Sequence, residues 1–361
     1  MNACPNCNYQ KTEPFFHLKN SPILQNILLA TESEARGVEK IDVDFEYCPN
    51  CHFVFNPKFD ESSVNYTEIY DNNQMGSPEY TNYIDGLTDR IVADCSLNSD
   101  SKILEIGCGN GYFLSKIKEK SSSKFVRGYD PTYNGQHQMS EFINKSYFQP
   151  EAGETFEWIA LRHALEGMLN YDGVLTGILA SMHRKTKLYL EIVNLDYIIK
   201  QKDLSLLYYE CARYYSLRSL QQMLSKYNLE IQQVYSLFND NYLGVFASKR
   251  PDVRDLAEVR TKLKETVPNY NKVVIWGIAG RAISTMAHFG WEPEVVQYGV
   301  DIDRNKQGKH IPVTGQLIVS PEEAVNFQPQ LVIVANANYL TEIKQHFDRG
   351  TKFLTLDGVL H

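Results

Sequence analysis

The feature that most constrains the fold is a short apolar run that leads into a glycine-rich turn and then a helix. The stretch Leu104-Glu105-Ile106-Gly107-Cys108-Gly109-Asn110-Gly111 has glycine in a GxGxG pattern, and apolar residues at helical spacing follow it. Glycine permits a tight turn and lets the backbone approach a ligand closely. On a strand–turn–helix, such a turn indicates a nucleotide-cofactor site in an α/β protein. We therefore predict a buried strand over residues 103–106.

The same alternation of short apolar runs with helical stretches continues along the chain and indicates doubly wound parallel sheets. Two later runs, residues 231–235 and 242–247, predict an antiparallel pair that closes the first sheet. The charged residues 249–252 indicate a boundary between two α/β units. The runs read as strands are 125–126, 156–161, 188–193, 273–277, 295–300 and 331–334.

Four of the seven cysteines lie in two matched Cys-Pro-Asn-Cys turns, as Cys4, Cys7, Cys48 and Cys51. Two such turns can present four thiolates tetrahedrally to one zinc ion. Redox dithiols or cysteines without a ligand are the alternatives. Because a four-cysteine site has no open coordination position, the zinc would be structural. It would stabilise a lobe over residues 1–60, which has few apolar residues to bury.

The composition excludes several classes of protein. The net charge of −8 over 361 residues argues against a broad basic surface for nucleic acid. No stretch approaches the ~18 uninterrupted apolar residues that a membrane span needs. The N-terminal stretch lacks the apolar core of a secretory signal, so we expect a cytoplasmic protein, in which disulfides are rare.

The acid that ends the second predicted strand indicates the cofactor. Asp130 lies where a carboxylate can accept hydrogen bonds from both ribose hydroxyls. Together with GxGxG in place of GxGxxG, it fits S-adenosylmethionine (SAM) better than a nicotinamide dinucleotide. A tight turn without a ligand is the other alternative. The predicted cofactor-binding residues are Glu105, Gly107, Gly109, Gly111 and Asp130.

At these residues the sequence resembles class I SAM-dependent methyltransferases, in particular the multidomain group that includes the deoxysugar C-methyltransferases. The two cysteine turns are similar to the family's zinc lobe, and the glycine loop with Gly128-Tyr129-Asp130 is similar to its cofactor site. The resemblance covers nearly the whole chain. It implies a zinc-binding lobe (residues 1–60), a SAM domain (61–250) and a C-terminal Rossmann-like domain (251–361). It also implies a small-molecule acceptor such as a nucleotide-linked sugar.

On the acceptor side, the resemblance points to a segment in which Tyr208 and Glu210 keep the family's pattern, whereas the family's basic histidine is replaced by Cys211. A free thiol, which titrates at about pH 8.5, is a poor base at neutral pH. Cys211 is either a small buried residue or a catalytic one. Three interpretations stay open. Glu210 or a tyrosine is the base for methylation of carbon, the acceptor atom is oxygen or nitrogen, or the chain binds SAM without turnover.

Two further side chains are candidates for the catalytic site. His163 follows the fourth strand, at the carboxyl edge where α/β sheets place ligands. It contacts the acceptor or the cofactor, or it bonds within the sheet edge. Tyr70 lies over the cofactor or acceptor, or it packs between the zinc lobe and the central sheet. The predicted catalytic residues are therefore Tyr208, Glu210, His163 and Tyr70.

The second α/β unit opens with a turn that keeps only Gly277 of the GxGxxG pattern in register, which is weak support for a second cofactor. The resemblance implies that this domain helps to bind a nucleotide-linked substrate. Helix N-termini there would suit a diphosphate. Arg281, Lys306 and Lys309 either add charge for such a group or are solvated surface side chains.

Overall fold

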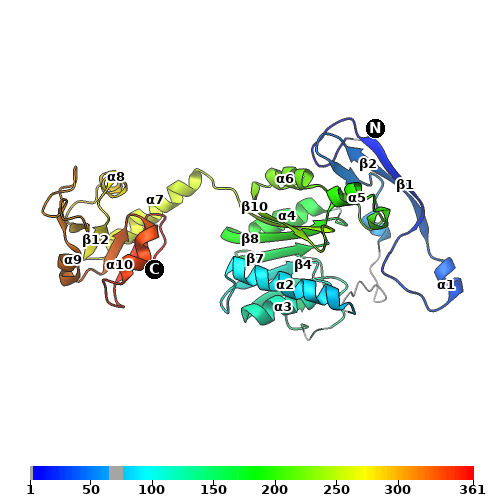
Figure 1. The fold of residues 1–361 in the computed structure, drawn as a ribbon, viewed down its shortest axis with the longest axis horizontal. Coiled ribbons are helices and arrows are strands. Elements are labelled where there is room, and N and C mark those ends of the chain that lie inside the picture. The colour runs from blue at the N-terminus through cyan, green and yellow to red at the C-terminus, as the bar shows by residue number, and fades with distance from the viewer. Residues whose placement is uncertain (1–2, 65–75, 136, 138, 169) are drawn as a thin grey trace. The chain divides into compact units, whose positions relative to one another are not determined.

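The computed structural model describes residues 3–64, 76–135, 137, 139–168 and 170–361. It divides the chain into two compact units, Met1–Arg250 and Pro251–His361 (Figure 1). We call these unit 1 and unit 2. The division lies at the charged stretch of residues 249–252. The further separation of unit 1 into a zinc lobe and a SAM domain stays a prediction.

The central sheet of unit 1 has the strand order β10-β11-β8-β7-β4-β5-β6. Strands β4 to β8 run parallel, β11 pairs antiparallel with β8, and β10 pairs antiparallel with β11, which confirms the predicted closing pair. The strands are β4 (Lys102–Ile106), β5 (Phe125–Tyr129), β6 (Ile143–Asn144), β7 (Phe156–Arg162), β8 (Met182–Val193), β10 (Leu229–Leu237) and β11 (Tyr242–Lys249).

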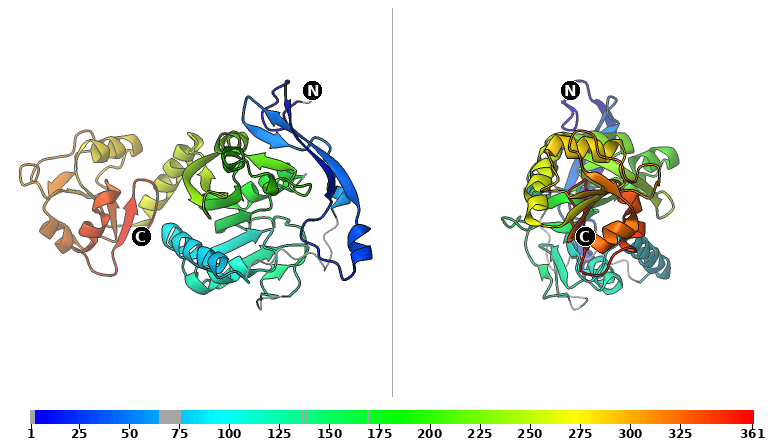
Figure 2. Two further views of the ribbon diagram at one scale, coloured as in Figure 1. Left: turned by 45° about the vertical axis from the view of Figure 1, so that its right-hand side comes forward. Right: turned by 90° about the vertical axis from the view of Figure 1, so that its left-hand side faces the viewer.

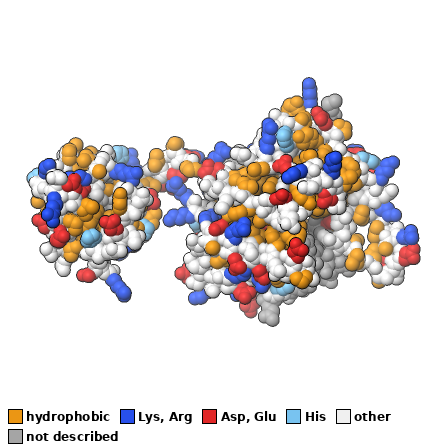
Figure 3. Space-filling view, viewed as in Figure 1, with side chains coloured by type: hydrophobic (Ala, Val, Ile, Leu, Met, Phe, Trp, Pro, Cys, Tyr) orange, Lys and Arg blue, Asp and Glu red, His pale blue; other side chains and the backbone are white. Residues whose placement is uncertain are grey.

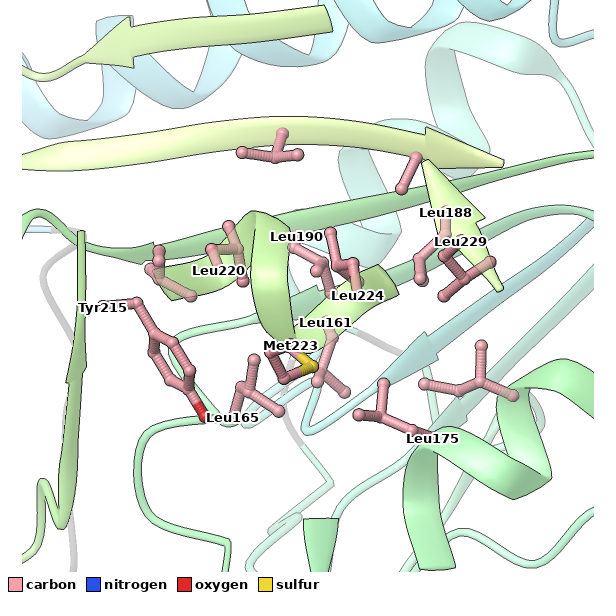
Figure 4. Close-up of a cluster of buried hydrophobic side chains, with 14 of the residues drawn as sticks. Leu161, Leu165, Leu175, Leu188, Leu190, Tyr215, Leu220, Met223, Leu224 and Leu229 are labelled. Carbon is pink, nitrogen blue, oxygen red and sulfur yellow. The ribbon is translucent and has the colours of Figure 1, made fainter. Parts of the chain in front are cut away.

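Helices cover both faces of this sheet, as expected for a doubly wound fold. On one face, α4 (Tyr171–Ala180) and α6 (Leu217–Lys226) bury leucines against β7 and β8 (Figure 4). On the other face, α2 (Pro78–Cys95) and α3 (Tyr112–Ser121) pack over β4 and β7. Helix α2 is capped by Ser77, whose side chain accepts a hydrogen bond from the N–H of Tyr80.

A second, smaller sheet in unit 1 has the order β1-β2-β3-β9. Its first three strands come from the N-terminal region: β1 (Glu13–Pro22), β2 (Lys40–Cys48) and β3 (Phe53–Phe55). Its fourth strand, β9 (Arg213–Tyr215), comes from far along the chain and pairs antiparallel with β3. Figure 2 shows the short helix α1 (Glu32–Arg36) in the loop that joins β1 to β2. The acceptor-side segment therefore shares a sheet with the cysteine-bearing region.

Several connections around these sheets in unit 1 contain short helices. They comprise η1 (Glu61–Ser63), α5 (Leu195–Gln201) and η3 (Leu204–Leu206). Helix α5 directly follows β8, and η3 leads into the segment that carries Tyr208 and Glu210. The end of β8 is thus connected through two short helices to the acceptor-side segment.

Unit 2 is built on a parallel sheet of order β14-β13-β12-β15-β16 with apolar clusters on both faces. The strand predicted over residues 295–300 is shorter in the structure, where only Tyr298–Val300 forms β13. Its elements are α7 (Arg254–Thr266), η4 (Val267–Asn269), β12 (Val273–Trp276), α8 (Gly280–Phe289), β13, β14 (Leu317–Val319), α9 (Pro321–Phe327), β15 (Leu331–Val334), η5 (Ala337–Tyr339), α10 (Leu340–Lys344) and β16 (Lys352–Thr355).

The surface mixes charges of both signs. On the face drawn in Figure 3, basic and acidic side chains are interspersed over each unit, and the described side chains form no continuous basic area there. Among the described helices, none combines the length and apolar character needed to cross a membrane.

Candidate active site

The glycine-rich turn between β4 and α3 is shaped by three glycines in the left-handed region. The φ angle is 71° at Gly107, 55° at Gly109 and 84° at Gly111. Residues that carry a side chain rarely adopt this backbone conformation, which explains the glycine at each position. The N–H of Gly107 donates to the carbonyl oxygen of Tyr129 at 2.8 Å, so the turn is fastened to the end of the neighbouring strand β5.

Two of these glycines are also required because their neighbours lie very close. A Cβ atom on Gly107 would lie 2.7 Å from the Cβ of Ala164, and one on Gly111 would lie 2.5 Å from Cδ1 of Ile143. Both distances are far below van der Waals contact. The loop after β7, which carries His163 and Ala164, therefore lies directly against the glycine turn.

Asp130 follows β5 and is 8% exposed. Its Oδ2 accepts a hydrogen bond from the N–H of Gly109 at 2.7 Å, which ties the carboxylate to the glycine turn. Its Oδ1 accepts both from the N–H of Thr132 at 2.8 Å and from the Thr132 hydroxyl at 2.6 Å. Since each carboxylate oxygen has about two acceptor positions, one position on Oδ2 has no partner among the described residues. A second ribose hydroxyl would have to displace Thr132.

Glu105 is 1% exposed, and its Oε2 has no hydrogen-bond partner among the described residues. Burial raises the pKa of Glu105 to about 8, although the charge of Arg162 lowers it. An unsatisfied buried polar group costs about 1–3 kcal/mol, so such groups need an explanation. A bound cation or hydrogen-bond donor next to Glu105 would remove this cost.

These residues fit SAM. Its cationic groups complement the buried carboxyl of Glu105, and a ribose hydroxyl can donate to the open position on Asp130. The turn with glycine at 107, 109 and 111 lets the backbone approach a ligand closely. The geometry is consistent with the prediction that Glu105, Asp130 and the three glycines hold the cofactor, and their roles stay a prediction.

A buried ion pair lies at the carboxyl ends of the adjacent strands β7 and β8. Arg162 and Glu191 are register partners, and the guanidinium binds the carboxylate with two hydrogen bonds: Nε to Oε2 at 2.9 Å and a terminal nitrogen to Oε1 at 2.8 Å. Burial raises the pKa of Glu191. The charge of Arg162 and the hydrogen bond from His163 nevertheless hold this pKa well below its ordinary value. Glu191 is therefore ionised at neutral pH.

The strand period explains why Glu105, Arg162 and Glu191 gather on one face. Side chains two residues apart point to the same side of a strand. Ile103, Ala160 and Tyr189, which precede the three residues by two positions, all belong to the apolar cluster under α2 and α3. The three ionisable residues continue these rows toward the carboxyl edge of the sheet.

His163 joins the ion pair at the sheet edge. Its Nε2 lies 2.9 Å from Oε1 of Glu191, and its φ angle of 48° is unusual for a residue other than glycine. Its side chain is 31% exposed, in contrast to that of Glu191, which is 0% exposed. The sequence left open whether His163 bonds within the sheet edge or meets a ligand. The structure shows the bond within the edge, and one side of the ring stays accessible.

Aromatic side chains surround this histidine. The rings of His163 and Tyr242 meet edge to face with centroids 4.4 Å apart, and Phe238 stacks on Tyr242 with centroids 5.8 Å apart. The Tyr83 hydroxyl, from α2, donates to Oε1 of Glu191 at 2.9 Å. Burial raises the pKa of Tyr242 to about 12, so this phenol is neutral at physiological pH.

Comparisons with known proteins agree on the class of enzyme. A family model described as a methyltransferase domain matches residues 80–234, and one described as a C-methyltransferase C-terminal domain matches residues 220–356. The C-methyltransferase NovU of Streptomyces niveus is 21% identical over 403 residues, which covers 98% of this chain and 95% of the relative. These matches support a class I SAM-dependent methyltransferase of the C-methyltransferase type.

Solved structures that resemble this methyltransferase include a magnesium protoporphyrin IX methyltransferase from Synechocystis with bound S-adenosylhomocysteine (SAH). It is 15% identical with a TM-score of 0.36, over 47% of this chain and 83% of that one. The plantazolicin methyltransferase BpumL with SAH is 14% identical with a TM-score of 0.38, over 47% and 83%. Similarity at this level supports no conclusion by itself.

Tyr208 and Glu210 of this methyltransferase lie between η3 and β9, on the segment that joins the N-terminal sheet. Glu210 is buried, and its Oε2 accepts a hydrogen bond from the N–H of Gln25, in the loop after β1, at 2.6 Å. The N–H of Tyr208 donates to the hydroxyl of Tyr214 at 3.0 Å. The structure thus shows Glu210 fastening the N-terminal region to this segment, and the catalytic roles of both residues stay predictions.

Cys211 is 3% exposed, and its thiol donates to the carbonyl oxygen of Arg213 at 3.3 Å. Burial raises the pKa of this thiol well above its ordinary value. A thiol of this kind stays protonated at neutral pH and is inert. The structure therefore favours the interpretation of Cys211 as a small buried residue.

Tyr70, the remaining predicted catalytic residue, lies outside the described residues. The N-terminal cysteines lie inside them. The sulfur atoms of Cys4, Cys7, Cys48 and Cys51 lie within 4.8 Å of one another. Such a group matches the donor set of a structural zinc site.

The cysteine group also has amide donors around it. The Asn6 side-chain amide lies 3.6 Å from the sulfur of Cys51, and the Asn50 amide lies 3.5 Å from that of Cys7. The asparagine that both turns share therefore donates to a sulfur of the other turn. Donors of this kind orient the ligands of metal sites.

Sequence reasoning gave no role to Arg162, Glu191, Tyr83 and Tyr242, which the structure gathers around His163. The available signal was positional, because Arg162 directly follows the predicted strand over residues 156–161 and Glu191 lies inside the predicted buried strand over residues 188–193. Charged residues are almost never buried unless they are paired. That signal could have found the ion pair, whereas nothing in the sequence connects Tyr83 to it.

Proposed function

We propose that this methyltransferase transfers the methyl group of SAM to a carbon atom of a small-molecule acceptor. The observation that carries the proposal is the His163 imidazole. Glu191 holds it at 2.9 Å, and it lies one residue from Ala164, which packs against the Gly107 turn. A carbon acceptor needs a base to become a nucleophile, whereas oxygen or nitrogen needs at most the loss of one proton. The matches to C-methyltransferases support the same choice.

We further propose that the acceptor is a nucleotide-linked sugar with a keto group, as the resemblance to deoxysugar C-methyltransferases implies. A keto group acidifies the adjacent C–H bond, so a neutral imidazole can remove that proton. In this scheme His163 takes the proton. Tyr208 and Glu210 shape the acceptor side, and Tyr70 is retained there on the resemblance alone. SAM, when bound, supplies the electrophilic methyl group.

The test follows the acceptor proton rather than the methyl group alone. SAH in place of SAM permits deprotonation without transfer, so a carbon acceptor should exchange hydrogen for deuterium in heavy water. We expect exchange at the carbon next to the keto group and, with labelled SAM, a new C–methyl bond there. His163→Gln should reduce both by about 100-fold or more. Methyl transfer to oxygen or nitrogen without carbon exchange would contradict the proposal.

We also propose that the four-cysteine group binds one structural zinc ion. The clustered sulfur atoms and the asparagine amides that point at two of them support this assignment. Purified protein should contain about one equivalent of zinc. Cys48→Ser should lose it and destabilise unit 1 by about 3–5 kcal/mol. The free cysteine Cys95, outside the group, provides the control variant Cys95→Ser. Metal loss with unchanged stability would contradict a structural role.

A further inference from the structure

The carboxylate of Glu191 accepts more hydrogen bonds than an isolated side chain needs. Oε2 accepts from Nε of Arg162 and from the Tyr189 hydroxyl, the latter at 2.8 Å. Oε1 accepts from Arg162, Tyr83 and His163. Arg162, which can only donate, binds both oxygens, so a protonated Glu191 would lose one of these bonds and leave the buried guanidinium without a counter-charge. Glu191 is therefore an acceptor in all of these contacts.

This arrangement determines the tautomer of His163. Because Glu191 only accepts, the His163 Nε2 must carry the hydrogen that lies in the 2.9 Å contact. In neutral imidazole the other nitrogen, Nδ1, is then a bare acceptor. Nδ1 has no hydrogen-bond partner among the described residues, and the ring is partly exposed. The free acceptor atom thus belongs to the accessible part of the ring.

The ring is also fixed in orientation. The N–H of His163 donates to the carbonyl oxygen of Glu191 at 2.8 Å, so both backbone and side chain are anchored to β8. Tyr242 closes one side with its edge-to-face contact. The left-handed backbone at residue 163 is a local strain, and strain of this kind persists only where the surroundings determine it.

We propose that Glu191 is a positioning residue that holds His163 in the Nε2–H tautomer and leaves Nδ1 to accept the proton from the acceptor. The inference rests on the proposed function and assigns the atom that does the chemistry. The acceptor C–H bond breaks, and its proton goes to Nδ1. The electron pair stays on the carbon and forms the bond to the methyl group as the methyl–sulfur bond breaks. The imidazolium keeps its Nε2–H bond to Glu191 and later releases the Nδ1 proton to water.

Arg162 has a separate part in this scheme. Its two hydrogen bonds and its positive charge keep the carboxylate ionised, so Glu191 does not take the proton itself. Arg162 in turn lies over the Phe113 ring, with 4.0 Å from the guanidinium carbon to the ring centroid. The pair is therefore held by α3 as well as by the two strands.

The direct test is ¹⁵N NMR of histidine-labelled full-length protein with SAH at neutral pH. The signals that disappear in His163→Gln are those of His163, one of nine histidines. We expect a protonated Nε2 and an unprotonated Nδ1. A protonated Nδ1 with a bare Nε2 would overturn the inference. The readout needs no turnover, so a wrong tautomer and an absent carbon exchange are distinguishable failures.

A variant then tests the function of the contact. Glu191→Gln keeps the shape but removes the charge, and we expect mixed tautomers and about 100-fold slower carbon deuterium exchange with SAH affinity within about twofold. If that variant fails to fold, Tyr83→Phe removes one donor from the oxygen that holds His163. Thr81→Val, on the same helix, is the control, because the Thr81 hydroxyl donates to the carbonyl oxygen of Pro78. We expect the NMR signals of His163 to shift in Tyr83→Phe only. Unchanged His163 signals in Glu191→Gln, or in Tyr83→Phe where Glu191→Gln does not fold, would overturn the inference.

Discussion

The two units each contain a strand, a turn with glycine at positive φ, and a helix, built on the same plan. The N–H of Gly107 donates to the carbonyl oxygen of Tyr129 at 2.8 Å, and that of Gly277 donates to Val300 at the same distance. In each unit, the residue that follows the end of the neighbouring strand is an aspartate, and its carboxylate accepts a hydrogen bond from a backbone N–H of the turn. Asp130 accepts from Gly109 at 2.7 Å, and Asp301 accepts from Ile278 at 2.9 Å.

The two turns differ in the chemistry they offer. The residue two positions before the first glycine is Glu105 in unit 1 and Ile275 in unit 2, and Ile275 is part of the apolar core. Asp301 is 6% exposed, and its Oδ2 is also bound by the Lys306 ammonium at 2.8 Å. Within the described part of unit 1, Glu105 thus has an unsatisfied oxygen and Asp130 an open acceptor position, whereas unit 2 satisfies its acid internally. The shared plan supports the fold, and a few side chains decide cofactor binding.

The largest expected difference concerns the glycines. Gly107→Ala combines left-handed strain with a Cβ contact of 2.7 Å, so we expect a loss of about 3–5 kcal/mol in stability and no SAH binding. Gly277→Ala meets only the Ala335 Cβ at 3.9 Å and should cost about 1–2 kcal/mol, from strain alone. Gly86→Ala, in the open interior of α2, should be slightly stabilising. Denaturant unfolding measures all three, and equal losses in the first two would break the comparison.

The second prediction concerns the aspartates. Asp130→Ala should weaken SAH binding by about 100-fold, because hydrogen bonds to a charged group are worth about 1.5–3 kcal/mol each. Asp301→Ala should leave SAH affinity within about twofold. Calorimetric titration of both variants checks this. A strong loss in Asp301→Ala, or none in Asp130→Ala, would show that the difference between the turns has been assigned to the wrong residues.

The third prediction is a pH dependence carried by Glu105. Its pKa of about 8 means that it is mostly protonated at pH 7 before the cofactor binds. A cationic cofactor favours the ionised form, so SAM affinity should rise from pH 6 to pH 8 and binding should release roughly 0.9 proton at pH 7. Glu105→Gln should bind SAM about tenfold more weakly and release no proton on binding. The control Glu141→Gln, which changes an exposed side chain, should behave as wild type. Calorimetry in buffers of different ionisation enthalpy measures the release.

The same residue affects stability without cofactor. Because the native pKa of Glu105 lies above its ordinary value of 4.5, the native state binds more protons than the unfolded one in this range. The contribution is full below pH 4.5 and is lost as pH rises through about 8. Glu105→Gln should flatten this part of the stability curve. An unchanged slope would mean that Glu105 is ionised in the native state.

The smallest effect is expected at the ion pair that closes the unit 2 turn. Lys306→Met should destabilise unit 2 by about 1 kcal/mol, because Lys306 is partly exposed while Asp301 is buried. Lys309→Met, which removes an exposed charge nearby, is the control. Neither variant should change SAH affinity. Thermal unfolding measures the loss of stability. If Lys306→Met gained a second SAH site, the result would identify Lys306 as the group that prevents cofactor binding at the unit 2 turn.

Much of the architecture follows from local pattern. Short apolar runs that alternate with helical stretches predicted the parallel strands, and the matched cysteine turns predicted a metal site where the structure has a sulfur cluster. The closing pair over residues 231–247 is confirmed. Strand order is not a local property. Nothing in Arg213–Tyr215 indicates that these residues pair with Phe53–Phe55, because a three-residue strand carries no partner information.

The part of the site that lies in consecutive loops was predictable from the sequence. The part where several distant elements meet was not. The glycine turn and Asp130 are close in sequence and share a recognisable spacing. The His163 surroundings combine β7, β8, β11 and α2, and only the fold brings Tyr83 to Glu191. The burial of Glu105 and its unsatisfied oxygen likewise depend on neighbours that the sequence does not specify.

The most direct test of the account is a crystal structure of the full chain with SAH. We predict the nucleoside against the turn of residues 107–111, with a ribose hydroxyl on Oδ2 of Asp130 and the amino-acid portion near Glu105. SAH bound at Gly277 and Asp301, or a ribose that makes no contact with Asp130, would contradict it.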